Sequence, residues 1–367
     1  ERGGLGRLRP GAGDGSGAAR FETLSTADGL AHDWVKALWA DREGSLWIGT
    51  DGGGLGRLRN GAFTTYTTAE GLAHNFVYAL YEDPAGALWV GTDGGVSRLK
   101  DGKFATYTTA HGLSSTYVLS VYGSRDGSLW VGTYGAGLNR LQGGTFTTLT
   151  TKDGLPSDEV YALYEDAQGT LWIGTRFGLG RYRGDSLTSF TTRQGLSSND
   201  ITSMAEDARG RLWVGTYDGG LNVLEGDAVV RRYTTQDGLL SDHVLTLYAD
   251  AGGDVWIGTR EGGLNRFRPD GNGGGSFTAV APEQGLASDN VFQIVEDERG
   301  NLWMTCNQSL FRVSKADVDA FAEGRVERVT SVVYDRHDGL RTTEFNGGFQ
   351  PAGWRGRDGR LWFPSDK

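Results

Sequence analysis

Residues 82–113 read EDPAGALWVGTDGGVSRLKDGKFATYTTAHGL, and the pattern of this stretch returns throughout the chain. Its anchor is a Trp in an apolar run, which occurs as LWIGT at 46–50, LWVGT at 88–92, LWVGT at 129–133, LWIGT at 171–175, LWVGT at 212–216 and VWIGT at 255–259, with less regular copies LWMTC at 302–306 and LWFPS at 361–365. Successive Trp residues are 42, 41, 42, 41, 43, 47 and 59 positions apart. A Gly lies three residues before every Trp, and an Asp lies six before it in six of the eight copies. The chain is therefore an internal repeat of about 42 residues.

Each repeat contains four short runs that predict strands. In the second copy these runs cover residues 77–81, 88–90, 96–99 and 104–108, and turns rich in Asp and Gly separate them. Such clusters between β-branched and aromatic runs are hairpin signals, and the alternation with period two leaves little room for helices. Four strands in about 42 residues are typical of a β-propeller blade. Leucine-rich repeats are shorter, helical repeats need a 3.6-residue period, and the paired G-H and W-D landmarks of WD40 blades are absent.

The two chain ends predict how the propeller closes. Seven whole units lie between residues 30 and 335. The segments 4–8 and 21–24 match strands three and four, and the C-terminal strand around Trp362 matches strand two. Pairing these half-units would complete an eighth blade and satisfy open strand edges. We predict one all-β propeller over residues 1–367 with eight blades, in which 1–25 and 340–367 form the closing blade. Seven blades is the alternative, with the half-units belonging to a neighbouring propeller.

Composition excludes several classes of protein. The 60 Gly residues follow no collagen period and indicate many tight turns, while 15 Phe, 14 Tyr and 11 Trp argue against disorder. The 36 basic and 46 acidic residues give a net charge of −10, which disfavours a nucleic-acid partner. No apolar run approaches the 18 residues of a membrane helix. Cys306 is the single cysteine, so a disulfide framework and a multi-cysteine metal site are excluded.

Two kinds of loop lie on the same face of a propeller: those that link strand four to strand one of the next blade, and those that link strand two to strand three. We call these loops together the mouth. The first link carries a Gly-Leu pair with an apolar residue five positions after the Leu in all eight copies, which we interpret as a structural plug. Other mouth positions vary from copy to copy, which suggests a surface shaped for a ligand. Aromatic side chains beside carboxylates and amides suit a sugar or another polar ligand.

The candidate ligand-binding residues follow from this variation. After the Gly-Thr pair, four consecutive repeats carry aromatic or charged side chains, and neighbouring loops on one face should bring them into one patch. Arg offers a fork for carboxylate or hydroxyl groups, and aromatic rings offer a stacking face. Loop drift without function is the alternative for any one position. The predicted site is Tyr134, Arg176, Phe177, Tyr217, Asp218, Arg260 and Glu261, with Trp34, Tyr117 and His243 as outlying candidates.

No catalytic residue, metal site or cofactor is predicted. The sequence lacks G-x-S-x-G, H-E-x-x-H and a Gly-rich phosphate loop with Lys. His32 and His74 are equivalent residues of adjacent repeats, so their spacing reflects the blade rather than a coordination sphere. The recurrent Asp before the Trp is expected to accept hydrogen bonds from turn amides, and we do not count it as a site.

The stretch 82–113 and its counterpart EDAQGTLWIGTRFGLGRYRGDSLTSFTTRQGL at 165–196 resemble two-component regulator propeller repeats. The resemblance covers nearly the whole chain, and residues 338–363 resemble the family's last blade, although Pro364-Ser365 replaces the Gly-Thr pair. It implies the extracytoplasmic sensor half of a bacterial signalling protein, on the periplasmic side of the inner membrane. It also implies a following β-sandwich, one membrane helix and an output such as a histidine kinase or diguanylate cyclase, so the chain is expected to be a segment of a longer protein.

We therefore expect a sensor propeller that binds an oligosaccharide or another small molecule and has no chemistry of its own. Two alternatives stay open. A propeller glycoside hydrolase or lyase would use mouth carboxylates as an acid and base pair. A structural scaffold would instead mediate homodimerisation.

Overall fold

The repeats fold into eight four-stranded antiparallel sheets, which form an eight-bladed β-propeller. The structure, a computed structural model, describes residues 3–9, 20–270, 274–338, 340, 344–345, 354–355 and 359–365. The chain divides into two compact units. Unit 1 contains Glu1–Phe190 and Phe349–Lys367, and unit 2 contains Thr191–Gly348.

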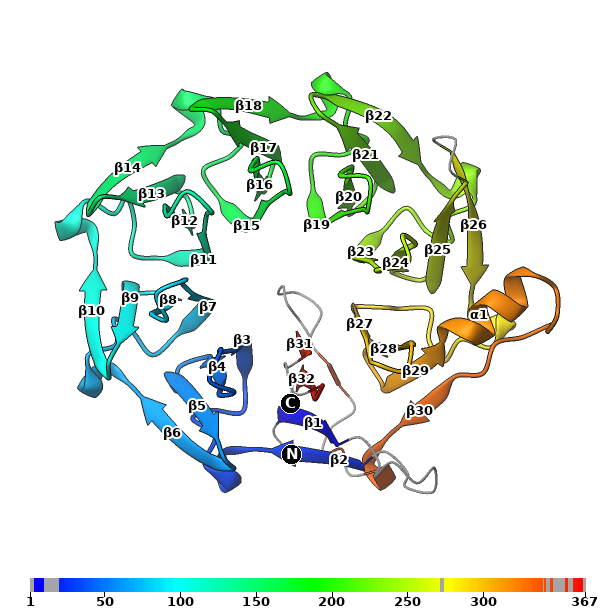
Figure 1. The fold of residues 1–367 in the computed structure, drawn as a ribbon, viewed down its shortest axis with the longest axis horizontal. Coiled ribbons are helices and arrows are strands. Elements are labelled where there is room, and N and C mark those ends of the chain that lie inside the picture. The colour runs from blue at the N-terminus through cyan, green and yellow to red at the C-terminus, as the bar shows by residue number, and fades with distance from the viewer. Residues whose placement is uncertain are drawn as a thin grey trace. The chain divides into compact units, whose positions relative to one another are not determined.

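Unit 1 holds blades one to four, and in each blade the four strands lie side by side in chain order (Figure 1). Blade one is β3 (Val35–Ala40), β4 (Leu46–Thr50), β5 (Leu55–Arg59) and β6 (Ala62–Tyr66); blade two is β7 (Val77–Glu82), β8 (Leu88–Thr92), β9 (Gly95–Lys100) and β10 (Lys103–Tyr107). Blade three is β11 (Val118–Gly123), β12 (Leu129–Thr133), β13 (Leu138–Gln142) and β14 (Thr145–Leu149); blade four is β15 (Val160–Glu165), β16 (Leu171–Thr175), β17 (Gly178–Arg183) and β18 (Ser186–Phe190). The predicted strands of the second copy are confirmed to within two residues.

Unit 2 holds blades five to seven with the same strand order (Figure 1). Blade five is β19 (Ile201–Glu206), β20 (Leu212–Thr216), β21 (Leu221–Glu225) and β22 (Ala228–Tyr233); blade six is β23 (Val244–Ala249), β24 (Val255–Thr259), β25 (Leu264–Pro269) and β26 (Gly275–Val280). Blade seven is β27 (Gln293–Glu296), β28 (Asn301–Thr305), β29 (Leu310–Ser314) and β30 (Val332–Tyr334), with helix α1 (Lys315–Ala322) inserted between its last two strands.

The closing blade joins the two ends of the chain within unit 1. Its strands are β31 (Trp354–Arg355), β32 (Leu361–Ser365), β1 (Gly4–Arg9) and β2 (Arg20–Leu24), in the order β2-β1-β32-β31. β1 pairs with β32 in antiparallel register, with Leu5 opposite Pro364 and Leu8 opposite Leu361. The predicted eighth blade is therefore confirmed, and the seven-blade alternative is wrong. Parts of the predicted segments 1–25 and 340–367 lie outside the described residues.

The recurrent Trp is the core anchor of each blade. All eight Trp side chains of strand two are buried, at 7% exposure or less. The Asp six residues earlier accepts the indole N–H of its Trp in six blades, as Asp41 does from Trp47 at 2.8 Å. The same Asp41 accepts the turn amides of Glu43 and Ser45, as the sequence predicted. The Asp-x-x-Gly turn is thus tied to the core through one carboxylate.

An Arg covers the Trp in every blade. In seven of them it comes from strand three, directly opposite the Trp in the ladder, as Arg57 lies opposite Trp47 with its guanidinium 5.0 Å from the ring centroid. Blade five has Val223 at that ladder position. There Arg211, two residues before Trp213, covers the ring at 5.8 Å and also pairs with Asp207 at 2.8 Å. In blade five, a residue at another position therefore provides the cation–π contact and the packing that the strand-three Arg provides in the other blades.

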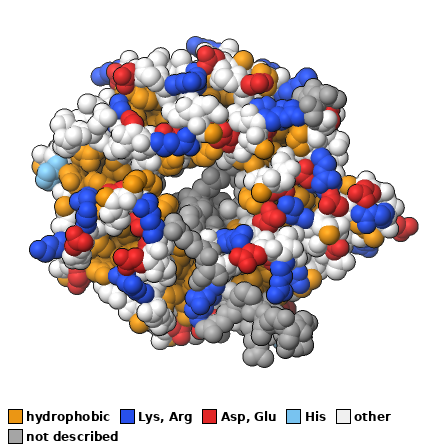
Figure 2. Space-filling model, viewed as in Figure 1, with side chains coloured by type: hydrophobic (Ala, Val, Ile, Leu, Met, Phe, Trp, Pro, Cys, Tyr) orange, Lys and Arg blue, Asp and Glu red, His pale blue; other side chains and the backbone are white. Residues whose placement is uncertain are grey.

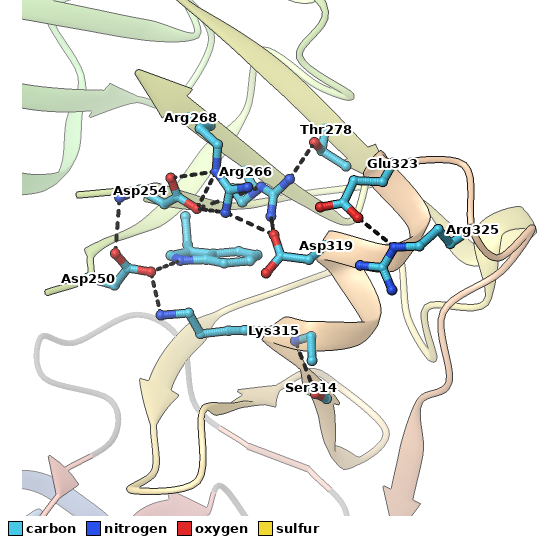
Figure 3. A network of polar contacts seen from close by, with 12 residues as sticks. Asp250, Asp254, Arg266, Arg268, Thr278, Ser314, Lys315, Asp319, Glu323 and Arg325 are labelled. Carbon is cyan, nitrogen blue, oxygen red and sulfur yellow. Dashed lines mark hydrogen bonds and ion pairs between the residues drawn. The ribbon is translucent and has the colours of Figure 1, made fainter. Parts of the chain in front are cut away.

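Helix α1 is a departure from the predicted pattern, which left little room for helices. Its Val318 and Ala320 are buried, and Ser314 caps its N-terminus. Asp319 on α1 accepts hydrogen bonds from Arg266 at 2.5 Å and Arg268 at 2.9 Å, both on β25 (Figure 3). A loop insertion in blade seven thereby fastens itself to blade six. The sequence signal is the 59-residue step between Trp303 and Trp362, which exceeds the usual 42.

Candidate functional site

The mouth links share one local structure. Each contains a short 3-10 turn, at η1 (Thr26–Asp28), η2 (Thr68–Glu70), η3 (Thr109–His111), η4 (Thr151–Asp153), η5 (Thr192–Gln194), η6 (Thr235–Asp237), η7 (Pro282–Gln284) and η8 (Arg336–Asp338). At η2 the Thr67 hydroxyl caps the turn, Gly71 ends it with φ of 102°, and Leu72 is buried. Only glycine adopts that φ without strain. The Gly-Leu pair is therefore structural, as predicted.

The first of the two variable residues before strand one also has a structural role. In blade two the side chain of Asn75 accepts the backbone N–H of Thr68 at 3.0 Å, which holds the 3-10 turn against the start of the strand. Four other blades use an Asp or Asn in the same way, namely Asp33, Asp158, Asn199 and Asp242. At these five positions the residue is either Asp or Asn, and both side chains offer the same oxygen as a hydrogen-bond acceptor. The variation between them therefore does not indicate ligand specificity.

His32 and His74 are explained by the turn that they complete. The Nδ1 atom of His74 accepts the backbone N–H of Phe76 at 3.2 Å, and His32 does the same for Trp34 at 3.1 Å. In five other blades a Ser hydroxyl takes this bond, from Ser115, Ser157, Ser198, Ser241 and Ser288. Each imidazole therefore acts as a turn acceptor. Within the described part of the chain, no group of three His, Cys, Asp or Glu residues is arranged to hold a metal ion.

The remaining variable residues meet in pairs across each blade. The residue after Gly-Thr donates its backbone N–H to the carbonyl of the residue just before strand one, as Tyr134 does to Tyr117 at 3.0 Å. Because a backbone hydrogen bond joins the two residues, their side chains project from the blade next to each other. The other pairs are Asp51 with Trp34, Asp93 with Phe76, Arg176 with Glu159, Tyr217 with Asp200, and Arg260 with His243.

In unit 1 this pairing builds a row of tyrosines. The rings of Tyr117 and Tyr134 are 5.3 Å apart, and Tyr78 of β7 lies 5.3 Å from Tyr117 on its other side. Tyr78 was not predicted as a site residue. It occupies a β-bulge between Val77 and Ala79, where an extra residue re-aims the side chain. Burial and a hydrogen bond with Tyr117 raise the pKa of the Tyr78 phenol, so it is a neutral hydrogen-bonding group at physiological pH.

A charged group adjoins this row in blade four. Arg176 binds Glu159 through one guanidinium nitrogen, 3.2 and 3.1 Å from the two carboxylate oxygens, and lies over the ring of Phe177 at 5.4 Å. The Tyr161 hydroxyl donates to Glu159 at 2.6 Å. These bonds, the one from Tyr161 first, lower the pKa of Glu159, and the Glu159 pair raises the pKa of Arg176. Glu159 and Tyr161 were not predicted; Tyr161 sits at the bulge of β15, equivalent to Tyr78.

Unit 2 brings together three of its predicted residues. Tyr217 and His243 stack with their ring centroids 5.1 Å apart, and the Tyr217 hydroxyl accepts from Arg260 at 3.0 Å. Glu261 lies beside Arg260 at 3.6 Å, and its backbone has the positive φ of 60° that is uncommon for a residue with a side chain. Asp218 is exposed next to Tyr217.

The exposed aromatic side chains concentrate at the mouth. Among the described residues, the large aromatics that are 40–56% exposed are Trp34, Tyr134, Tyr161, Phe177 and Tyr217. Trp34 has the ammonium group of Lys36 over its ring, 5.3 Å from the centroid. Figure 2 shows acidic and basic side chains interspersed on one face of each unit. The prediction of one patch from Tyr134 to Glu261 spans both units and stays a prediction.

The fold and the site define a β-propeller with a chemically varied mouth, and comparison with known proteins places its repeats in a family. Six segments match the model described as two component regulator propeller, at residues 71–94, 112–135, 154–177, 195–218, 238–261 and 285–308. Each segment begins at the Gly of a Gly-Leu pair and ends in the loop after strand two, which follows Gly-Thr in five segments and Thr305-Cys306 in the sixth. Six of the eight repeats are therefore two-component regulator propeller repeats. A comparison with curated proteins finds no match.

Solved structures share the fold at low identity. The extracellular domain of BT3049, described as a hybrid two component system from B. thetaiotaomicron, has a TM-score of 0.57 at 20% identity, with 95% of this chain and 58% of that chain covered. PorZ of the Porphyromonas gingivalis type-IX secretion system has 0.53 at 15%, covering 95% and 54%. Virginiamycin B lyase from Staphylococcus aureus has 0.52 at 16%, covering 74% and 91%. The chain thus spans little more than half the length of the first two.

Of the helices that the structure describes, none has the length and apolar character needed to cross a bilayer.

Proposed function

We propose that this chain is the ligand-sensing propeller of a bacterial two-component signalling protein, and that its ligand binds at the mouth. The observation that carries the proposal is the concentration of exposed aromatics at the mouth of a propeller built from regulator repeats. A scaffold needs the same residues in every blade, and exposed apolar side chains that gather on one surface mark an interaction site. Extracytoplasmic placement, and a β-sandwich, membrane helix and histidine kinase or diguanylate cyclase in the same protein, belong to this proposal.

The chemistry of the mouth favours an oligosaccharide or another small polar ligand. The rings of Tyr117 and Tyr134 offer flat apolar faces, and Arg176 and Glu159 beside them offer donors and acceptors. Such a combination binds molecules with apolar faces and hydroxyl edges. In unit 2, Tyr217 and Arg260 repeat the combination of ring and guanidinium.

Catalysis by the mouth carboxylates is not favoured. A general acid needs a carboxyl whose pKa is raised toward neutral pH. Glu159 has a lowered pKa because it accepts from Tyr161 and pairs with Arg176, so it stays ionised. The likeness to virginiamycin B lyase lies at the level of the fold.

Binding of a glycan array to the purified chain tests the proposal, followed by titration calorimetry with the best ligand. Arg176→Ala and Tyr217→Ala should each weaken binding about tenfold, a loss of about 1.4 kcal/mol, with an unchanged melting temperature. Arg183→Ala is the matched control, because Arg183 is exposed at the opposite end of blade four. An unchanged affinity in the Arg176→Ala/Tyr217→Ala double variant would rule out this sector. Hydrolysis or elimination of the ligand by the isolated chain would reject a purely sensory role.

Light scattering of the same sample tests the scaffold alternative. A stable dimer that binds no ligand would favour homodimerisation as the main role. A ligand-binding monomer, or a dimer whose affinity for ligand depends on the mouth residues, would support the sensor.

A further inference from the structure

The turns between strands one and two lie at the opposite end of each blade from the mouth, and neighbouring turns are joined by an Arg in two places. In blade one the guanidinium of Arg42 donates to the carbonyl of Pro84 in blade two at 2.9 Å, and its backbone N–H donates to Glu82 at 3.2 Å. In blade three Arg125 donates to the carbonyl of Ala167 at 2.8 Å in the same way. The groove between these turns is therefore filled by an arginine side chain.

The groove between blades five and six lacks this filling. Ala208 occupies the position of Arg42, and Ala249 occupies the position of Glu82. Ala205 also stands where blades one to four and blade six have Trp or Tyr near the end of strand one. The chain thus has Ala at all three positions where a larger side chain would fill or bridge the groove.

A cavity of about 510 Å³ lies at this groove. We call it the turn cavity. Its small lining residues include Ala208, Gly252 and Gly253, and its cationic ones are Arg209, Arg268 and Lys315. All of them belong to unit 2. Lys315, the first residue of α1, reaches the cavity because the blade-seven insertion packs against blade six (Figure 3).

The carboxylates of the turn cavity are already occupied by donors. Asp250 accepts from the Trp256 indole at 2.9 Å, from the Asp254 amide at 3.0 Å and from Lys315 at 2.5 Å. Asp254 binds the Arg268 guanidinium with contacts of 2.7–3.1 Å (Figure 3). Asp207 accepts from Trp213 and Arg211. These acids have no need of a cationic ligand.

The cations retain unused donors. The Arg209 guanidinium makes no hydrogen bond or ion pair with the part of the chain that is described, and Arg268 has 47% of its side chain exposed. Lys315, 24% exposed, has a third N–H beyond those that bind Asp250 and Glu296. A guanidinium is matched by the oxygens of a carboxylate, phosphate or sulfate group.

We propose that the turn cavity binds a small molecule through an oxyanion, a carboxylate, phosphate or sulfate group held by Arg209 and Arg268. This site is separate from the mouth and does not depend on the function proposed for the mouth. A ligand in the turn cavity contacts the turns of blades five and six and the start of α1. It therefore joins the turns of two neighbouring blades, as Arg42 and Arg125 do elsewhere in the chain.

Titration calorimetry of the full chain tests the site with inorganic phosphate, inorganic sulfate and D-glucuronate as probes, and L-argininamide as the oppositely charged probe. At least one oxyanion should bind saturably at one site, and Arg209→Gln should weaken it about tenfold or more. Arg299→Gln is the matched control, because Arg299 holds the same turn position in blade seven and lies outside the cavity. It should leave the affinity unchanged.

Ala208→Arg provides a second, independent variant. It restores the arginine of blades one and three, so it should fill the groove and abolish oxyanion binding without lowering the melting temperature. The comparison of the three probes identifies which oxyanion the cavity prefers. Absence of saturable binding to all three, an equal effect of Arg209→Gln and Arg299→Gln, or binding of L-argininamide in place of the oxyanions would overturn the proposal.

Discussion

At the scale of the residue, the Trp of strand two anchors the core of each blade. Trp130 is 2% exposed and packs in a cluster with Leu138, Leu155 and Val160 of blades three and four. Trp130→Ala should lower the free energy of unfolding by about 3–5 kcal/mol, because the cavity cannot close between two sheets. Denaturant unfolding measures this. Tyr134→Ala, on the exposed mouth of the same blade, is the control, and an equal loss in both would contradict the assignment.

The acidic turns predict how stability depends on pH. Burial pushes the pKa of Asp297 upward, but hydrogen bonds from the Trp303 indole and from Asn301 outweigh it, and the pKa is lowered overall. The pKa values of Asp207 and Asp250 are lowered for similar reasons. A carboxyl with a lowered folded pKa stabilises the fold above its unfolded pKa of about 3.9. That contribution is lost as the pH falls through the folded value.

We therefore expect the denaturation midpoint to change little between pH 7 and pH 5 from these groups and to fall steeply below about pH 4. Asp297→Asn should be less stable at neutral pH and should lose less on acidification. Thermal melts between pH 2.5 and pH 7 measure both slopes, with Asp218→Asn at an exposed site for comparison. A wild-type midpoint that rises on acidification would show that the sign is wrong.

Blade five offers a test of residue exchange. Arg211 covers Trp213 and pairs with buried Asp207, because Val223 stands where the other blades have Arg. Arg211→Ser introduces the residue that blade one has at this position, Ser45, and should cost about 3 kcal/mol by leaving Asp207 without its ion pair. Adding Val223→Arg should recover at least about 1 kcal/mol of that loss. If the two substitutions had strictly additive effects in this double-mutant cycle, the idea that Arg211 takes the role of the strand-three Arg would be wrong.

At the scale of the element, the mouth links separate scaffold from site. His74 and its equivalents show that a varied residue can have an invariant role, since Ser supplies the same bond in five blades. His74→Ser should change the unfolding free energy by less than about 0.5 kcal/mol. His74→Ala removes the acceptor and should cost about 1 kcal/mol. If metal addition raised the melting temperature of wild type and not of His74→Ser, the turn role would be incomplete.

The β-bulges explain which site residues were missed. The sequence predicted Tyr117, Tyr134 and Arg176 because they stand in loops that vary between repeats. Tyr78 and Tyr161 stand inside predicted strands, where alternation assigns each side chain to one face of a sheet. The bulge inserts an unpaired residue there and turns its side chain toward the mouth. The same comparison between repeats would have found them, since this position holds Lys36, Leu119 and Thr202 in other blades.

At the scale of the whole molecule, the closing blade makes the fold depend on both chain ends. Deleting residues 1–25 removes β1 and β2 and leaves β32 as an open edge. The side chains lost include Leu5, Leu8, Phe21 and Leu24, all buried, so the cost should exceed about 6 kcal/mol at 1.5 kcal/mol or more for each. Denaturation and size-exclusion chromatography should show a less stable, aggregating protein.

A circular permutant is the control for that deletion. Gly4 pairs with Ser365, so a short linker can join the ends, and new termini can be placed at the exposed turn of Gly143 and Gly144. This permutant keeps all strands of the closing blade and should unfold at nearly the wild-type midpoint. A permutant as unstable as the deletion would show that the order of the chain, rather than the closing sheet, is what matters.

The sequence by itself determined the repeat and the four strands of each blade, and it favoured eight blades closed by both termini over the seven-blade alternative. These follow from local alternation, turn residues and the anchor spacing, which are properties of short segments. Only the tertiary structure decided that Arg211 replaces a strand-three Arg, that bulges turn Tyr78 and Tyr161 toward the mouth, and that α1 packs beside a cavity at blade six. The physical reason is that each depends on a neighbour far away in sequence, through packing and hydrogen bonds that no local period records.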